Sequence, residues 1–324
     1  MNKFNYIQPK TMNETSNLLK KNSESAIAFA GGTDVLGLIK NSILLPKDVV
    51  NLKSLKGLAE IKYVPGREMQ IGALVTLAEI ADHPVIKEKF TVLAQAAHDV
   101  ASPQFRNVAT LGGNICQRPR CMYFRKESVH CLRKGGDICY AYNGFNKYHC
   151  IIGGGPCYIV HPSDTAVALL ALNAKVSIYS QGKTRIIPIK DFFVLPDVDF
   201  KKENILTAGE IVEKIIIPEQ PAGSRSGYVK FMEREVWDFA IVSVAAVLNK
   251  SQNKINNVKL AFGGVAPIPW NSNDIDSAFK GIDSSEESLK KVSDNLFSKA
   301  DILEMNAYKI PLVRNLTKRL LMNL

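Results

Sequence analysis

Short apolar and amphipathic runs alternate along the whole chain, and they divide it into three regions. In the first region, residues 1–55, Thr11 and Glu14 have the spacing of a capping box at the start of a helix. The pattern predicts, in order, a helix over 11–20, a strand over 26–30, a helix over 34–40 and a strand over 48–52. These elements indicate a small α/β lobe.

The second region, residues 56–219, begins with hairpin-like strands from Leu58 onward, separated by the turn Pro65-Gly66-Arg67-Glu68. The pattern then predicts helices over 76–81, 92–100 and 165–172, and strands over 175–179 and 184–188. A segment over about 115–160 interrupts this order, because it is rich in glycine and basic residues and poor in apolar periodicity. We expect it to be a long loop.

The third region, residues 220–324, has strand patterns first and helix patterns afterwards. The expected strands are 228–232, 240–248 and 258–262, and the expected helices are 284–298 and 307–321. Strands followed by helices are typical of an α+β domain. At 324 residues, the chain exceeds the usual size of a single core, so two or three domains are expected.

All six cysteines lie within the window 113–162, which also holds three of the five histidines. Thiolates that gather in one loop indicate a metal site, since buried structural cysteines are scattered through a core. An iron–sulfur cluster suits the wide, uneven spacing. Zinc remains an alternative, although the close Cys-x-x-Cys pairs that it usually uses are absent. Disulfides are another, although residues 1–6 have no apolar run typical of a secretory leader.

The chain is basic, with 41 Lys and Arg against 31 Asp and Glu, a net charge of +10. Most of this charge is expected on solvated surface, and the sharper interpretation is attraction to an acidic partner or an anionic cofactor. No nucleic-acid reading motif is found, so no nucleic-acid partner is expected. No apolar stretch reaches the length of a membrane helix, which predicts a soluble protein without a membrane span.

Two glycine pairs suggest an anionic ligand. Phe29-Ala30-Gly31-Gly32-Thr33-Asp34 lies where a buried strand turns into a helix, and Thr110-Leu111-Gly112-Gly113-Asn114 immediately precedes the first cysteine. Such turns let backbone N–H groups approach a phosphate, although a lone Gly-Gly turn is more often structural. Two loops of this kind could hold a dinucleotide's pyrophosphate from both sides. Neither matches the nicotinamide or ATP fingerprints, so NAD and ATP sites are not indicated.

These motifs, taken in order, resemble the FAD-binding subunit of the molybdenum hydroxylases, the family of xanthine dehydrogenase, aldehyde oxidoreductase and carbon monoxide dehydrogenase. The resemblance rests on the two glycine loops, Pro162-Ser163-Asp164-Thr165-Ala166, Tyr228-Val229-Lys230, Trp237-Asp238-Phe239-Ala240 and Gly263-Gly264-Val265-Ala266-Pro267. It implies an α+β chain with a two-lobed FAD-binding domain of the PCMH (vanillyl-alcohol oxidase-like) type. A smaller α+β C-terminal domain, with a three-stranded sheet and a helical bundle, would follow.

The resemblance also implies a set of cofactor-binding residues. It places the FAD pyrophosphate on the loop formed by Phe29, Ala30, Gly31, Gly32, Thr33, Asp34 and Val35, with Thr110, Gly112, Gly113 and Asn114 on the other side. Asp164 would bind the sugar chain, and Lys230 and Val212 would lie near the flavin. Taken alone, Asp164 could simply cap the helix that begins at Thr165, and Lys230 could be an exposed lysine.

The cysteine loop resembles the insert of 4-hydroxybenzoyl-CoA reductase and of bacterial periplasmic aldehyde oxidoreductase, which binds one four-iron four-sulfur cluster. By this resemblance the metal ligands are Cys121, Cys131, Cys139 and Cys157, whereas Cys116 and Cys150 are free thiols. The cluster would serve either as an electron relay or as a structural staple.

The function implied is electron transfer. A partner subunit would hold the molybdenum cofactor, a second would carry two two-iron clusters, and this chain would pass electrons through FAD to an external acceptor. The three would form a heterotrimer or a dimer of heterotrimers. No catalytic acid or base is nominated on this chain. Cytoplasmic location is expected, with co-export to the periplasm as an alternative. A stand-alone flavoenzyme and a metal-binding interaction module without flavin are the alternative functions.

Overall fold

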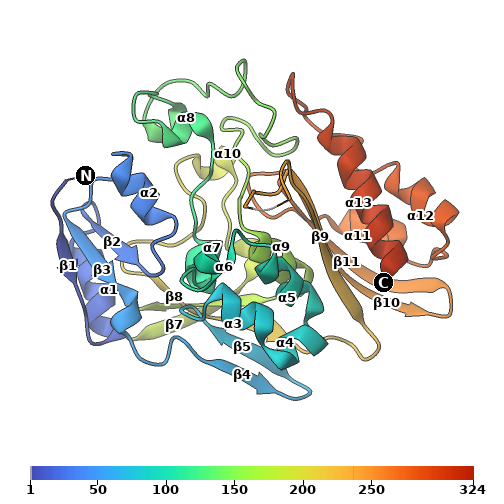
Figure 1. Cartoon of the computed structure of the whole chain (residues 1–324), viewed down its shortest axis with the longest axis horizontal. Coiled ribbons are helices and arrows are strands. Elements are labelled where there is room, and N and C mark those ends of the chain that lie inside the picture. Colours follow the sequence, from blue (N-terminus) through green and yellow to red (C-terminus); the bar gives the residue numbers. More distant parts are fainter. Residues whose placement is uncertain (1, 236) are drawn as a thin grey trace.

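The structure is a computed structural model that describes residues 2–235 and 237–324. Its α+β fold is built on three sheets, of which the N-terminal one is parallel, with strand order β1-β3-β2 (Figure 1). The elements of this lobe are β1 (Asn5–Ile7), α1 (Met12–Lys21), β2 (Ala26–Phe29), α2 (Val35–Lys40) and β3 (Asp48–Asn51). Thr11 caps α1, since its side-chain oxygen accepts from the N–H of Glu14.

The second lobe is a five-stranded antiparallel sheet of order β4-β5-β8-β6-β7. Its strands are β4 (Ile61–Val64), β5 (Glu68–Gly72), β6 (Lys175–Ser180), β7 (Lys183–Pro188) and β8 (Ile211–Pro218). The accompanying helices are α3 (Leu77–Asp82), α4 (Pro84–Lys89), α5 (Thr91–His98), α6 (Pro103–Arg106), α7 (Leu111–Ile115) and α9 (Asp164–Ala171). Ile71 and Ile215 of the sheet share one buried core with Leu93 and Leu169 of the helices.

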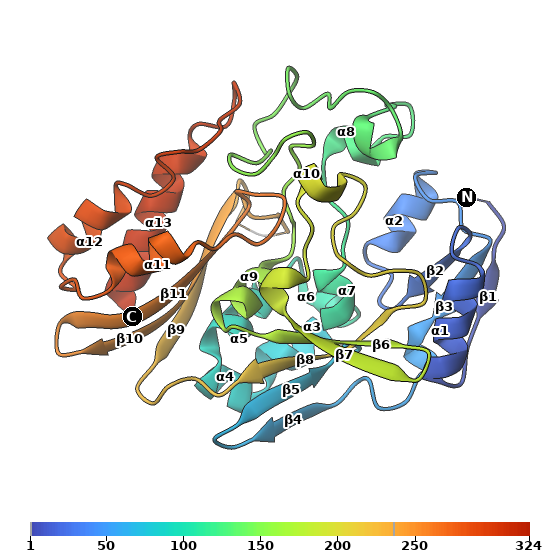
Figure 2. The same cartoon turned by 180° about the vertical axis from the view of Figure 1, so that it is seen from behind.

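The C-terminal domain contains the third sheet, β9 (Arg225–Phe231), β10 (Val242–Ser251) and β11 (Lys254–Gly263), in the antiparallel order β11-β10-β9. Helices α11 (Asn273–Phe279), α12 (Glu286–Ser293) and α13 (Lys309–Asn323) accompany it (Figure 2). Val244 and Leu248 of β10 pack into the core beneath these helices, while Ala245 and Val247 belong to the core of the second lobe. Burial on both faces explains the uninterrupted apolar run of β10.

The cysteine loop lies between the N-terminal lobe and the C-terminal domain in both views (Figures 1 and 2). It contains only the short helix α8 (Met122–Arg125) and one 3₁₀ turn, Leu132–Lys134. Its position is fixed by side chains from both neighbours. Arg125 pairs with Asp34 of the N-terminal lobe, and Lys309 of α13 donates to the backbone carbonyl of His149. The remaining short helix, α10 (Pro196–Asp199), lies beside the loop.

Several elements differ from the sequence predictions. The helix expected over 284–298 ends at Ser293, and Phe297 has a φ of 55°, which a continuing right-handed helix does not permit. The pattern gave no element for β1, β8, α4 or α11. Each of these is short or lacks clean periodicity, and β8 is buried between β5 and β6. No helix in the described part of the chain is long and apolar enough to cross a membrane.

Candidate functional site

The glycine loops line a cavity of about 440 Å³, here called the glycine-loop cavity. Among the residues predicted to bind cofactor, its walls include Ala30, Gly31, Gly32, Thr33, Asp34, Val35, Thr110, Gly112, Gly113 and Val212. The two loops meet here, because a Cβ on Gly31 would lie 2.1 Å from the backbone oxygen of Val108. Only glycine permits this approach. Phe29 lies just outside the cavity, with its ring against Gly32.

The two loops offer different backbone groups to a ligand. Among the hydrogen bonds of the described residues, none uses the N–H of Gly31, Gly32, Thr33 or Asp34 as a donor. Successive free N–H groups of this kind form a concave anion site, or nest. In the second loop, by contrast, the N–H groups of Gly112 and Gly113 donate to Ala73 O at 2.9 Å and to Thr110 Oγ1 at 3.2 Å. The second loop therefore provides a close wall, and its backbone donors are already used.

The side chain of Asp34 is engaged by the cysteine loop. Its Oδ1 lies 2.9 Å from Arg120 Nη1 and 2.6 Å from Arg125 Nη2, and its Oδ2 accepts from the backbone N–H of Arg118 at 2.8 Å. Two guanidinium groups neutralise the carboxylate, which would otherwise repel an anion in the nest. Asp34 thus contributes its N–H to the cavity and its carboxylate to the anchoring of the loop.

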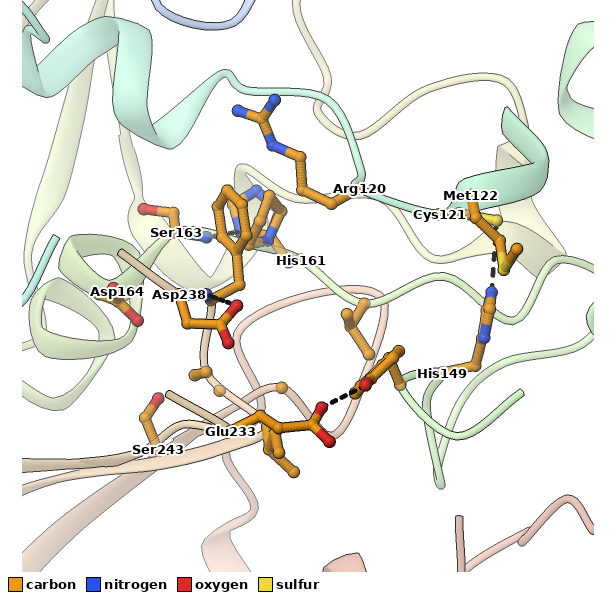
Figure 3. Close-up of a pocket in the computed structure, with 18 of the residues that line it drawn as sticks. Arg120, Cys121, Met122, His149, His161, Ser163, Asp164, Glu233, Asp238 and Ser243 are labelled. Atoms are coloured by element: carbon orange, nitrogen blue, oxygen red, sulfur yellow. Dashed lines mark hydrogen bonds between the residues drawn. The ribbon is translucent and has the colours of Figure 1, made fainter. Parts of the chain in front are cut away.

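A second cavity of about 450 Å³, here called the ring cavity, opens between the cysteine loop, the segment before α9 and the C-terminal sheet (Figure 3). Asp164 lies in its wall, and its two oxygens accept from Tyr228 Oη and Lys230 Nζ, each at 2.7 Å. Both partners of the Asp164–Lys230 ion pair are buried, at 5% and 1% side-chain exposure. Burial also raises the pKa of Tyr228 well above its usual value, so this phenol stays protonated. The predicted Lys230 is therefore not an exposed lysine.

Four polar atoms in the wall of the ring cavity are buried without a hydrogen-bond partner among the described residues. They are Arg120 Nε, His149 Nδ1, His161 Nε2 and Ser243 Oγ. An unsatisfied buried polar group costs about 1–3 kcal/mol, so such groups seldom persist without a partner. Burial lowers the pKa of His161 to about 3 and that of His149 to about 4, so both rings are neutral at pH 7. These atoms are available to a ligand with polar edges.

Asn114 joins the two cavities. It belongs to α7, whose first residues line the glycine-loop cavity, and its Oδ1 accepts from Ser163 Oγ at 2.5 Å and from Thr165 Oγ1 at 2.7 Å. Ser163 lines the ring cavity and caps α9. Nearby, the chain passes from Arg118 in one cavity wall to Arg120 in the other. Asn114 itself lines neither cavity, and the walls of the two cavities adjoin here.

Two family models together match nearly the whole chain. Residues 2–220 match the FAD binding domain in molybdopterin dehydrogenase, and residues 227–324 match the CO dehydrogenase flavoprotein C-terminal domain. The chain belongs to the FAD-binding subunits of the molybdenum hydroxylases. The predicted α+β fold, FAD-binding role and oxidoreductase class are confirmed by these matches and by the relatives described next.

Individual relatives match this chain over almost their full length. The chain is 33% identical over 317 residues to the aldehyde oxidoreductase FAD-binding subunit PaoB of Escherichia coli K12, covering 97% of this chain and 96% of PaoB. It is 26% identical to the nicotine 6-hydroxylase medium subunit of Paenarthrobacter nicotinovorans, covering 97% and 94%. A carbon monoxide dehydrogenase structure from Hydrogenophaga pseudoflava superposes with a TM-score of 0.77 at 22% identity, covering 99% and 96%, and it shares the fold.

Four thiols of this chain line a third, small cavity, here called the thiol cavity. They are the predicted ligands Cys121, Cys131, Cys139 and Cys157. The other two cysteines lie apart, because Cys116 lines the glycine-loop cavity and Cys150 is buried outside the lining of the thiol cavity. None of the six forms a disulfide. Within residues 2–235 and 237–324, no three His, Cys, Asp or Glu side chains converge closely enough to hold a single metal ion.

The thiol cavity combines low polarity with one buried cation. Burial raises the pKa of Cys121 to about 11, and a hydrogen bond between Cys139 and Cys157 lowers the pKa of Cys139 while raising that of Cys157. Arg133 is buried beside them, with Nη1 3.9 Å from Cys157 Sγ and Nε donating to Glu203 at 3.0 Å. Its positive charge can offset the charge that deprotonated thiols would bring.

Sequence reasoning missed several residues of the site. The sequence patterns do not indicate four residues that line the ring cavity, which are His149, His161, Arg120 and Ser243. The run Tyr148-His149-Cys150 was the available signal for His149, since it places a histidine beside a cysteine in the ligand-rich loop. The structure also separates two residues that the resemblance grouped. Val212 lines the glycine-loop cavity, whereas Lys230 pairs with Asp164 beside the ring cavity.

Proposed function

We propose that one FAD lies across the two large cavities, with its adenosine and pyrophosphate in the glycine-loop cavity and its flavin ring in the ring cavity. The observation that carries this proposal is the pairing of a free N–H nest at Gly31–Asp34 with four unpartnered polar atoms in the neighbouring cavity. The nest suits a pyrophosphate, and the unpartnered atoms suit the polar edges of an isoalloxazine. Membership of the FAD-binding family supports the same ligand.

The individual residues have distinct parts in this arrangement. Thr110 Oγ1 accepts from Gly113 N, so its hydroxyl proton remains available to the pyrophosphate. Asn114 holds Ser163 at the junction where the sugar chain passes. Asp164, Tyr228 and Lys230 form a fully paired unit in the wall of the ring cavity, which holds the wall rigid beside the flavin. Val212 packs near the adenosine half of the cofactor, in the glycine-loop cavity.

We also propose that Cys121, Cys131, Cys139 and Cys157 hold one four-iron four-sulfur cluster. In such a cluster each thiolate binds a different iron, so the four sulfurs surround a cage and do not converge on one point. The lining of one cavity by all four of these thiols supports the proposal. The buried Arg133 would offset the negative charge of the cluster. The resemblance of the loop to cluster-binding inserts supports the same assignment.

The activity that we propose is electron relay. FAD accepts electrons singly or in pairs and so can join carriers of different stoichiometry. A subunit with the molybdenum cofactor and a subunit with two two-iron clusters would supply the electrons, and an external acceptor would receive them. Relatives described as medium or FAD-binding subunits support such an assembly. The chain's own residues bind and orient the cofactors, and substrate chemistry takes place on the partner.

The domain limits that we propose are 1–55 and 56–219 for the two FAD-binding lobes, with the insert at about 115–160, and 220–324 for the C-terminal domain. One sheet in each of the three regions supports them. In the folded chain, the ring cavity and the glycine-loop cavity each take residues from more than one of these regions. The regions are therefore expected to cooperate in binding.

A comparison of flavins tests the two-cavity arrangement. The full chain would be purified, freed of flavin, and titrated with FAD and with FMN while flavin fluorescence is followed. We expect FAD to bind at least about tenfold more tightly than FMN, a difference of about 1.4 kcal/mol, because FMN leaves the adenosine part of the glycine-loop cavity empty. Equal affinities for FAD and FMN would contradict the two-cavity arrangement. Failure to bind either flavin would rule out flavin binding altogether.

A further inference from the structure

The ring cavity and the thiol cavity share a wall. Cys121 and His149 are the residues that line both cavities. Their side chains lie side by side at one end of the ring cavity, with His149 Nε2 3.3 Å from Cys121 Sγ (Figure 3). The opposite end of the same cavity holds Asp164 and Ser163 (Figure 3). A group bound in the ring cavity would therefore meet the thiol cavity at this wall, which one of the four thiols and an imidazole ring form.

The backbone at His149 is held by two side chains of the C-terminal domain. The backbone oxygen of His149 accepts from Lys309 Nζ at 2.9 Å, and the next backbone oxygen, that of Cys150, accepts from Asn306 Nδ2 at 2.9 Å. The Tyr123 ring lies 6.2 Å from the imidazole, centroid to centroid. The Nδ1 atom of His149 is one of the unpartnered polar atoms of the ring cavity, while its Nε2 atom faces Cys121 Sγ. One ring nitrogen thus serves each cavity.

We propose that His149 donates its Nε2–H to the Cys121 thiolate, and that this pair is the path by which electrons pass between the flavin and the cluster. The inference rests on the proposed function. One electron crosses at a time: the flavin loses one electron, the cluster gains one, and no atom is transferred. His149 acts as a positioning and tuning residue. Its hydrogen bond to a ligand sulfur stabilises the more negative, reduced cluster and so raises the reduction potential.

A relay and a structural staple make different demands on this wall. A staple needs four ligands and a stable loop, but it has no need of contact with the flavin. A relay needs the cluster and the flavin ring to share a thin wall, which is the arrangement of Cys121 and His149. The hydrogen bond also gives a measurable property, the cluster potential, that a purely structural histidine would not influence.

The test uses the full chain purified without oxygen, in four forms: wild type, His149→Leu, His149→Gln and His98→Leu. Glutamine keeps a side-chain N–H donor, whereas leucine removes it. His98 is a matched control because its side chain is 72% exposed and lies outside all three cavities. Each form would be analysed for FAD, iron and sulfide, for the cluster potential by a redox titration followed by electron paramagnetic resonance, and for flavin-to-cluster electron transfer after flash reduction of the flavin.

We expect His149→Leu to have a lower cluster potential and slower transfer at unchanged cofactor content, His149→Gln to restore the potential at least in part, and His98→Leu to match wild type. An unchanged potential and rate in His149→Leu would overturn the inference. If His149→Leu loses iron, His149→Gln decides: wild-type behaviour supports the inference, and loss of iron there too makes His149 a structural residue. Wild-type protein without FAD or without iron would instead overturn the proposed function.

Discussion

Asp34 of the glycine loop pairs with Arg125 of the cysteine loop, with 2.6 Å between Oδ1 and Nη2, across 91 residues of sequence. Both side chains are mostly buried, at 17% and 15% exposure. The pair ties the segment that carries the thiols to the segment that carries the anion nest. The glycine loop and the cysteine loop are thus joined by a largely buried ion pair.

Replacing Asp34 should weaken both sites. Asp34→Asn leaves two guanidinium groups without their carboxylate, and breaking a largely buried ion pair costs about 3 kcal/mol. We expect urea unfolding to require less free energy by about that amount, with FAD and iron contents both reduced. Lys290→Met, which removes an exposed pair with Asp294, is the control and should cost less than about 1 kcal/mol. Equal effects of the two changes would contradict the anchoring role of Asp34.

The six cysteines should fall into two classes. Serine at position 121, 131, 139 or 157 removes one thiolate of the proposed cluster, so each of Cys121→Ser, Cys131→Ser, Cys139→Ser and Cys157→Ser should lose the bound iron, about four atoms per chain. Cys116→Ser and Cys150→Ser should retain it, because both thiols lie outside the thiol cavity. Iron and acid-labile sulfide analysis checks this. Full iron content in any variant of the first class would show that the replaced cysteine is not a ligand.

Gly31 should be intolerant of any side chain. A Cβ there would lie 2.1 Å from Val108 O, so Gly31→Ala must push the two glycine loops apart and distort the nest. We expect FAD affinity to fall by at least about tenfold, about 1.4 kcal/mol, measured by fluorescence titration. Gly37→Ala is a matched control in α2, because a Cβ at Gly37 meets nothing within 4 Å. It should keep FAD and gain about 0.5–1 kcal/mol of stability.

Lys309 should stabilise the loop around His149. It is fully buried, and its Nζ donates to the backbone oxygens of Tyr148, His149 and Gly264 at 3.0, 2.9 and 2.6 Å. Lys309→Met would leave these carbonyls unpaired and should lower the free energy of unfolding by about 3 kcal/mol. Urea unfolding at pH 7 measures the loss, and a variant as stable as wild type would show that these hydrogen bonds contribute little.

Lys309 also predicts a pH dependence. Burial lowers its pKa from 10.5 to about 7, so between these values the unfolded chain binds a proton that the folded chain has released. The free energy of unfolding should therefore rise with pH in this window, by at most about 1.4 kcal/mol per pH unit. Burial raises the pKa of the neighbouring Cys150, which stays neutral there. Lys309→Met should lack this rise, and identical pH profiles of the two proteins would contradict the assignment.

Local patterns predicted the fold where each element is determined by its own sequence. The continuous apolar run of β10 and the capping residue Thr11 were readable because burial on two faces and a cap leave a local trace. β8 was not recognised, since its eight residues mix apolar positions with Glu213 and Lys214 and its partners β5 and β6 lie far away in sequence. Contacts of that kind have no short-range signal.

The same distinction applies to the site. Glycines must occupy the tight turn at Gly31 and Gly32, so the sequence revealed the nest. The partners of Asp34, by contrast, come from Arg120 and Arg125, and only the folded loop brings them together. His149 likewise gains its role from its position between two cavities. A family resemblance supplies which residue types to look for, and the structure supplies which atoms they meet.

The cofactor content of the full chain purified without oxygen tests most directly whether it binds FAD and an iron–sulfur cluster. FAD, iron and acid-labile sulfide would be measured per chain together with the visible spectrum. We expect about one FAD, about four irons and about four sulfides, with overlapping flavin and iron–sulfur absorption. FAD without iron would contradict the proposed cluster and would show a subunit that binds flavin alone. Iron without FAD would contradict the proposal that the two large cavities hold FAD.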